Sequence, residues 1–112
     1  MKTKIDHLMG DCHMNRIILY LYFGGKKSKT EIYRNISTNP RMPKKLEYLE
    51  NEGYITVHQE GYAERPRNMI ELTPLGNTLA EGLCELEQNL GGDLDSVRFA
   101  YRSGSSNEEI KL

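Results

Sequence analysis

The chain has 112 residues, of which 38% are hydrophobic and 28% are charged, and its formal net charge is −1. It is the size of one domain with a single modest core, and its composition is that of an ordinary soluble protein. No apolar run approaches the roughly 18 residues that a bilayer-spanning helix needs, and the first ten residues lack the apolar centre of a secretion signal, so we expect a cytoplasmic protein without a membrane partner.

The first predicted helix covers residues 12–23, within the stretch DCHMNRIILYLYFGG. Its apolar stripe has the spacing i, i+3, i+4 and i+7 and consists of Met14, Ile17, Ile18 and Leu21. Asp11 is a good N-cap, and the Gly24-Gly25 pair ends the helix. Residues 1–10 have no clear period, so we interpret them as an N-terminal arm.

Two further helices follow. The short one covers residues 29–36, and Ser28 with Glu31 has the S-x-x-E spacing of a capping box, in which each side chain satisfies a free backbone N–H. The next covers residues 39–52, with Asn39 as the N-cap and Pro40 at the first helical position, where no hydrogen bond is lost. Gly53 then supplies the left-handed residue that ends this helix.

The helix over residues 39–52 has a buried face and a basic face. Met42, Leu46 and Leu49 fall at i, i+4 and i+7 and form the buried stripe. The residues left on the exposed side lie toward its N-terminal half and are Asn39, Arg41, Lys44, Lys45 and Tyr48. Glu50 and Glu52 make the opposite end acidic.

Two alternating segments, YITVHQ and NMIELT, predict a β-hairpin. Ile55 and Val57 share one face of the first strand, and Ile70 and Leu72 continue the alternation in the second. The segment EGYAERPR between them is too long for a tight turn and contains two arginines. We therefore predict a hairpin with an extended, basic tip.

The last long helix begins after Thr73 as the N-cap, with Pro74 at its first position. Its leucines step by 4, 4, 3 and 4 residues and form a narrow seam of Leu75, Leu79, Leu83, Leu86 and Leu90. A core already closed by three helices and a hairpin does not need so regular a seam, so we predict that the same helix of a second subunit covers it. The segment over residues 93–112 predicts a short amphipathic element packed on this helix, followed by a mobile tail.

The order of helix, short helix, helix and hairpin with a basic tip is that of a winged helix-turn-helix domain. The stretch over residues 17–90 resembles the bacterial and archaeal winged-helix transcription regulators of the MarR and HxlR type. KKLEYLENEGYI is similar to the L-x-x-L-E-x-x-G-L-I ending of that group's recognition helix, and IELTPLG is similar to its Y-x-L-T-P-x-G exit from the wing. The resemblance implies a mainly α fold with a small β-hairpin (α+β), in which a three-helix core plus wing covers residues 11–74 and a dimerisation helix covers residues 75–92.

The resemblance also implies a function: a homodimer that binds double-stranded DNA sequence-specifically, regulates transcription and associates with the nucleoid. The recognition helix over residues 39–52 would enter the major groove, and the wing over residues 60–68 would touch the backbone or the minor groove. By position, the DNA-facing residues would be Asn39, Arg41, Lys44, Lys45 and Tyr48 on the helix and Arg65 and Arg67 on the wing. Pro40 and Pro43 replace the small polar residues of many relatives, and a prolyl ring cannot donate to a base, so base reading would shift to the neighbouring cations.

The small net charge hides a division that suits this interpretation. Residues 26–67 carry nine Lys and Arg against six Asp and Glu, whereas residues 71–112 carry three against eight. A protein can bind DNA without being basic overall, provided that its positive charge is gathered where the phosphates lie. The sequence identifies no target site and no small-molecule effector.

Other functions remain open. The same domain could serve as a clamp in a DNA-organising protein or in plasmid or chromosome segregation, and a winged helix can also bind protein instead of DNA. The basic residues could form an ordinary solvated helix face with partners at i+3 and i+4. The arrangement of flanking helix and basic wing favours DNA.

The sequence gives little support to a metal site or to catalysis. His7, Cys12 and His13, with Asp6 and Asp11 nearby, include zinc ligand types, but their spacing matches no recurrent pattern. The two cysteines, Cys12 and Cys84, lie far apart, and the pattern favours buried thiols over a disulfide framework. No nucleophile–base arrangement, glycine-rich phosphate loop or carboxylate pair is present, so we expect neither an enzyme nor a cofactor.

Overall fold

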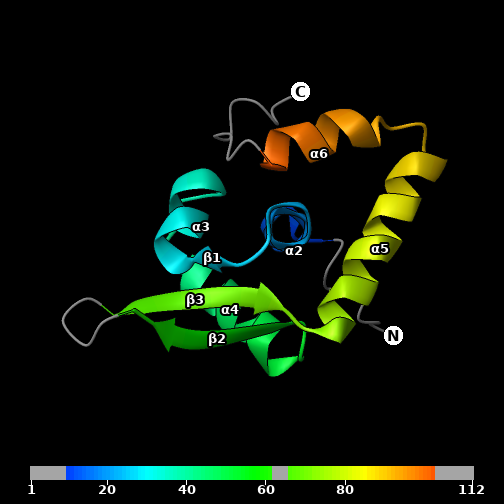
Figure 1. The fold of residues 1–112 in the computed structure, drawn as a ribbon. Helices are drawn as coiled ribbons and strands as arrows, with labels where there is room; N and C mark the ends of the chain where they lie inside the picture. The colour runs from blue at the N-terminus through cyan, green and yellow to red at the C-terminus, as the bar shows by residue number, and fades with distance from the viewer. Residues whose placement is uncertain (1–9, 62–65, 103–112) are drawn as a thin grey trace.

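A computed structural model describes residues 10–61 and 66–102 of the chain (Figure 1). The elements, labelled as in Figure 1, are α2 (Cys12–Gly24), β1 (Lys27–Ser28), α3 (Lys29–Asn35), α4 (Met42–Asn51), β2 (Ile55–Glu60), β3 (Arg67–Leu72), α5 (Pro74–Asn89) and α6 (Leu94–Arg102). The fold is mainly α with a small antiparallel sheet, as predicted. Most of the predicted arm, the centre of the predicted wing tip and the predicted tail lie outside the described residues.

α2 lies at the centre of the fold, with the sheet, α5 and α6 packed around it (Figure 1). It begins where predicted, because Asp11 Oδ1 accepts hydrogen bonds from the N–H groups of His13 at 3.0 Å and Met14 at 3.2 Å. It ends at Gly24, and Gly25 follows with a φ of 81°, which favours glycine. The predicted apolar stripe is confirmed, and the buried residues of α2 are Met14, Ile17, Ile18, Tyr20 and Leu21.

α3 and α4 form a helix-turn-helix that shares one core with α2. α3 begins at Lys29 because Ser28 Oγ accepts from the N–H of Glu31 at 3.1 Å, which is one half of the predicted capping box. The apolar faces of both helices are fully buried in the common core and consist of Ile32, Ile36, Met42, Leu46 and Leu49. This burial fixes how each helix is rotated about its own axis.

α4 begins later than predicted, and the assignment of Asn39 as its N-cap is wrong. The Asn39 carbonyl accepts from the N–H of Met42 at 3.0 Å, and Asn39 Oδ1 accepts from the N–H of Arg41 at 2.9 Å. These bonds close a turn in which Pro40 occupies the second position, suited to its fixed φ, and Arg41 (φ −85°, ψ −5°) the third. α4 therefore starts at Met42, with Pro43 in its first turn, where a missing N–H costs no hydrogen bond.

The predicted hairpin is confirmed and belongs to a larger sheet. β2 and β3 pair antiparallel, from Ile55 opposite Leu72 to Glu60 opposite Arg67. The predicted wing tip lies between these last two residues in the sequence. β1 was not predicted: its two residues pair with β3 and give the strand order β1-β3-β2. Ile55 and Ile70 are buried on the face that meets the helices.

α5 is capped as predicted, because Thr73 Oγ1 accepts from the N–H of Gly76 at 3.0 Å and Pro74 is the first helical residue. Its buried residues are Gly76 and Ala80, so the helix approaches the core through small side chains. The predicted leucine seam is divided. Leu79 and Leu83 pack partly buried against the core, whereas the exposed members are Leu75 at 50%, Leu86 at 40% and Leu90 at 77%.

α6 packs on both α2 and α5, so the predicted amphipathic element covers more than the one helix expected. Tyr101 is its main anchor: its ring centroid lies 6.3 Å from that of Tyr20 and 6.2 Å from that of Phe23. Burial raises the pKa of Tyr101 to about 12. None of the helices within the described ranges is both long and apolar enough to cross a membrane.

Candidate nucleic-acid interface

The turn before α4 and its first residues present two cations to solvent. Arg41 and Lys44 are exposed, whereas the opposite side of the helix, through Met42, Leu46 and Leu49, is fully buried. Arg41 and Lys44 line an open hollow of about 570 Å³ that lies between α4 and the start of α2, which we call the α4 hollow. Their backbone is held by the core, so their side chains project from a rigid element.

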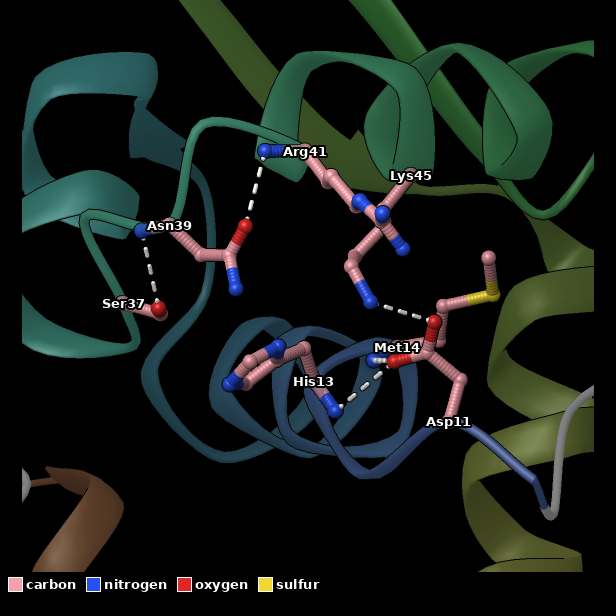
Figure 2. A network of polar contacts seen from close by, with 7 residues as sticks. All are labelled: Asp11, His13, Met14, Ser37, Asn39, Arg41 and Lys45. Atoms are coloured by element: carbon pink, nitrogen blue, oxygen red, sulfur yellow. Dashed lines mark hydrogen bonds and ion pairs between the residues drawn. The ribbon is translucent and has the colours of Figure 1, made fainter.

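Lys45 lines the α4 hollow with Arg41 and Lys44, but it is half-buried and so less exposed than predicted. Its Nζ donates to Asp11 Oδ2 at 2.5 Å (Figure 2), and the side chains of the pair are only 16% and 20% exposed. Asp11 therefore serves two helices, because Oδ1 caps α2 and Oδ2 binds α4. Partial burial raises the pKa of Asp11, but Lys45 and the two backbone donors outweigh it and hold the pKa below its ordinary value of 3.8.

Asn39 and Tyr48 lie at the edges of this surface. Asn39 is exposed, but its side-chain oxygen accepts from the N–H of Arg41 and its own N–H donates to Ser37 Oγ at 3.0 Å (Figure 2). Its amide nitrogen is the group left to offer to a ligand. Tyr48 is half-buried against the core and lines the α4 hollow, and burial raises its pKa.

The base of the wing carries Arg67, which is exposed at the first residue of β3. Glu60 stands opposite Arg67 in the ladder, but its carboxylate accepts from Lys26 Nζ at 2.7 Å and contacts His58 Nε2 at 2.5 Å. These two hydrogen bonds lower the pKa of Glu60. The other predicted wing cation, Arg65, lies outside the described residues, so its position is not assigned.

The structure places two cations that sequence reasoning missed, Lys29 and Arg34, in one hollow with the predicted Arg67. Lys29 and Arg34 on α3 and Arg67 on β3 line one hollow of about 440 Å³, which we call the wing hollow. The charges were visible in the sequence, but their proximity depends on β1, which joins the start of α3 to β3. A strand of two residues has no periodicity that sequence analysis could detect.

The candidate metal and thiol residues do not form a site within the described part of the chain. Among residues 10–61 and 66–102, no group of three or more His, Cys, Asp and Glu side chains is placed to hold a metal ion. Cys12 is exposed, contrary to the expectation of a buried thiol. Cys84 is partly buried, and this burial raises its pKa.

Comparisons with known proteins identify the fold. No protein-family model and no curated protein sequence matches the chain. Among solved structures, a protein from Porphyromonas gingivalis W83 assigned to the MarR family of transcriptional regulators is similar, with a TM-score of 0.57 and 20% identity over 73% of this chain and 80% of that chain. The circadian-clock-associated protein Pex from Anabaena gives a TM-score of 0.47 and 21% identity over 80% and 95% of the two chains. The first likeness shows that the chain has a winged-helix fold.

Proposed function

We propose that the protein is a sequence-specific transcriptional regulator that binds double-stranded DNA as a homodimer. Residues 39–52 enter the major groove, and the wing over residues 60–68 follows the backbone or the minor groove. The observation that carries the proposal is the exposure of Arg41 and Lys44 at the start of a helix whose opposite face is fully buried. The regulatory part draws on the fold shared with the MarR-family protein.

The basic residues divide into two chemical roles. Arg41 is held by the turn and the core, so its planar guanidinium can form two parallel hydrogen bonds with a guanine edge. Arg67 lies at the base of the wing and can contact phosphate, which gives affinity without reading sequence. Lys45 contributes by fixing α4 to α2 through Asp11 in place of the base contact expected from the sequence.

The homodimer part is supported by apolar side chains that α5 and α6 leave in solvent. The exposed ones are Leu75, Leu86, Leu90 and Phe99. Large apolar side chains left in solvent, such as Leu86 and Leu90 at the end of α5, are typical of protein interfaces when they form one patch. A symmetric contact through this side would place two copies of α4 roughly 34 Å apart, one DNA turn, on a pseudo-palindromic site.

Selection of bound duplexes from a random pool tests the proposal. We expect a consensus of two related half-sites. Binding without any enriched sequence would instead indicate a DNA-organising protein, and the absence of binding at moderate salt would favour a protein-binding winged helix.

Arg41→Ala then tests the assigned surface. Since it removes a base contact, we expect a loss of about 1–3 kcal/mol on the selected site and much less on random DNA. Arg98→Ala makes the same charge change on α6 and serves as the matched control, which should leave the specificity ratio unchanged. Equal losses for Arg41→Ala on both DNAs would contradict the role in base reading.

A further inference from the structure

The wing hollow has a fixed position that backbone pairing determines. Its walls come from the start and one side of α3 and from residues 66–68 at the base of the wing. In the β1–β3 ladder, Lys27 stands opposite Ile70 and Ser28 opposite Met69. Because Ser28 is also the N-cap of α3, this pairing places the first residue of α3 directly beside β3.

The hollow has an excess of positive charge. Lys29, Arg34 and Arg67 line it together with a single carboxylate, that of Glu31. Glu31 lies 4.0 Å from the ammonium of Lys27, which is outside the lining, so part of its charge is balanced elsewhere. Glu60, which stands opposite Arg67 in the β2–β3 ladder, is bonded to Lys26 and His58 instead. Within the described residues, none of the three cations in the hollow has an ion-pair partner.

The chemistry of the lining suits a phosphate group. Guanidinium groups bind phosphate oxygens through two parallel N–H bonds, and Arg34 and Arg67 come from different elements, so they can hold one phosphate from two sides. Thr30 and Asn68, both exposed in the lining, add a hydroxyl and an amide donor. In a helix-turn-helix, the helix before the recognition helix crosses the DNA backbone, and α3 occupies that place.

We infer that the wing hollow is a phosphate-binding site that holds one backbone phosphate of the bound duplex. The inference rests on the proposed function and adds a contact distinct from Arg41 and Lys44. Backbone contacts carry no sequence information, so this site sets where the duplex lies relative to α4. Arg34, which the sequence did not single out, is one of the three cations in its lining.

The test uses the full chain and the selected duplex, with one phosphate at a time replaced by a neutral methylphosphonate. At one position, the replacement should weaken binding by the wild type but not by Arg34→Gln, because that contact is already lost. Binding by Arg67→Gln should likewise be unaffected by the methylphosphonate at that same position. Losing one phosphate contact lowers the slope of log affinity against log salt by about 0.9, so between 50 and 200 mM salt each variant should lose roughly 3.5-fold less affinity than the wild type.

Two controls separate charge from structure. Arg34→Lys keeps the charge and should keep the wild-type slope and the sensitivity to methylphosphonate. Arg98→Gln removes a charge on α6 and should leave the response at every position unchanged. Circular dichroism and thermal unfolding verify that each variant folds.

The possible outcomes distinguish this inference from the proposed function. If every methylphosphonate weakens Arg34→Gln as much as the wild type while Arg41→Ala still loses specificity, the inference is overturned and the proposed function stands. If the wild type binds no duplex, both are overturned. A titration with inorganic phosphate could shift the side-chain NMR signals of Arg34 and Arg67 to a plateau while no methylphosphonate position depends on either residue. That result would assign the hollow to free phosphate and overturn the DNA contact.

Discussion

At the scale of single residues, Asp11 links the start of α2 to α4 with one carboxylate. Oδ1 satisfies two backbone donors at the N-terminus of α2, and Oδ2 holds Lys45. The two oxygens can be separated experimentally, because asparagine is as good an N-cap as aspartate but carries no charge. Asp11 is therefore a suitable residue for dividing capping from ion pairing.

We expect Asp11→Ala to lower the free energy of unfolding by about 1–2 kcal/mol for the cap, with a further loss for the unpaired Lys45. Asp11→Asn should lose less, because it keeps the cap. A double-mutant cycle of Asp11→Asn with Lys45→Met, measured by urea unfolding, should give a coupling of at least about 0.5 kcal/mol. A coupling of zero would mean that the ion pair contributes nothing to stability.

The ion pair of Asp11 and Lys45 should make the free energy of unfolding depend on pH. The pKa of Asp11 is lower in the folded chain than its ordinary value of 3.8, so its stabilising charge is fully present above that value and is lost as the pH falls through the lower, folded pKa. The stability difference between wild type and Asp11→Asn should stay constant from neutral pH to about pH 5 and shrink toward zero in stronger acid. Other carboxylates cancel in this difference. A difference that grew as the pH fell would contradict the assignment.

Lys45 also shows why the site could be predicted only in part. Helical periodicity separates the buried stripe from the rest of α4 and so identifies Arg41 and Lys44 as exposed, which the structure confirms. Lys45 lies at the flank of the stripe, and its long side chain reaches Asp11, 34 positions away in sequence. A partner so distant has no signature in the local pattern.

At the scale of elements, capping residues in the sequence located most helix starts. They could not reveal an element that forms only by pairing with a segment far away in the sequence. Asp11, Ser28 and Thr73 each cap the helix that the sequence assigned to them. The segment Asn39-Pro40 is compatible with both a helix start and a turn. The hydrogen bonds that Asn39 accepts from the N–H groups of Arg41 and Met42 show that it forms a turn. β1 escaped prediction because it exists only through its pairing with β3.

The junction of α5 with the sheet gives an element-scale prediction about two glycines of one helix. A Cβ at Gly76 would overlap the carbonyl oxygen of Tyr54 and lie 2.9 Å from Leu72 Cδ2, whereas a Cβ at Gly82 would meet nothing within 4 Å. Gly76→Ala should therefore push α5 off the sheet and cost at least about 1–3 kcal/mol. Gly82→Ala should gain about 0.5–1 kcal/mol from helix propensity. Thermal unfolding of the two variants measures both, and a neutral Gly76→Ala would contradict the close packing.

At the scale of the whole molecule, α5 differs in charge from the turn before α4 and the base of the wing. The exposed cations Arg41, Lys44 and Arg67 lie in the turn before α4, in the first turn of α4 and at the base of the wing. α5 carries exposed glutamates and neither Lys nor Arg, and these glutamates are Glu81, Glu85 and Glu87. The proposed DNA surface and the proposed dimer surface should therefore respond to salt in opposite directions.

Exposed leucines lie among these glutamates. Leu86, on the C-terminal half of α5, and Leu90, the residue that follows this helix, are exposed. A dimer through this end of α5 buries both leucines while bringing like charges of two copies together. Salt screens such repulsion. Sedimentation without DNA should therefore show a dimer at tens of micromolar that becomes tighter between low and high salt, whereas DNA affinity falls. Leu86→Ser with Leu90→Ser should give a folded monomer, because neither side chain is buried within one chain. A monomeric wild type would refute the dimer, and a dimer that salt weakens would show that opposite charges meet across the interface.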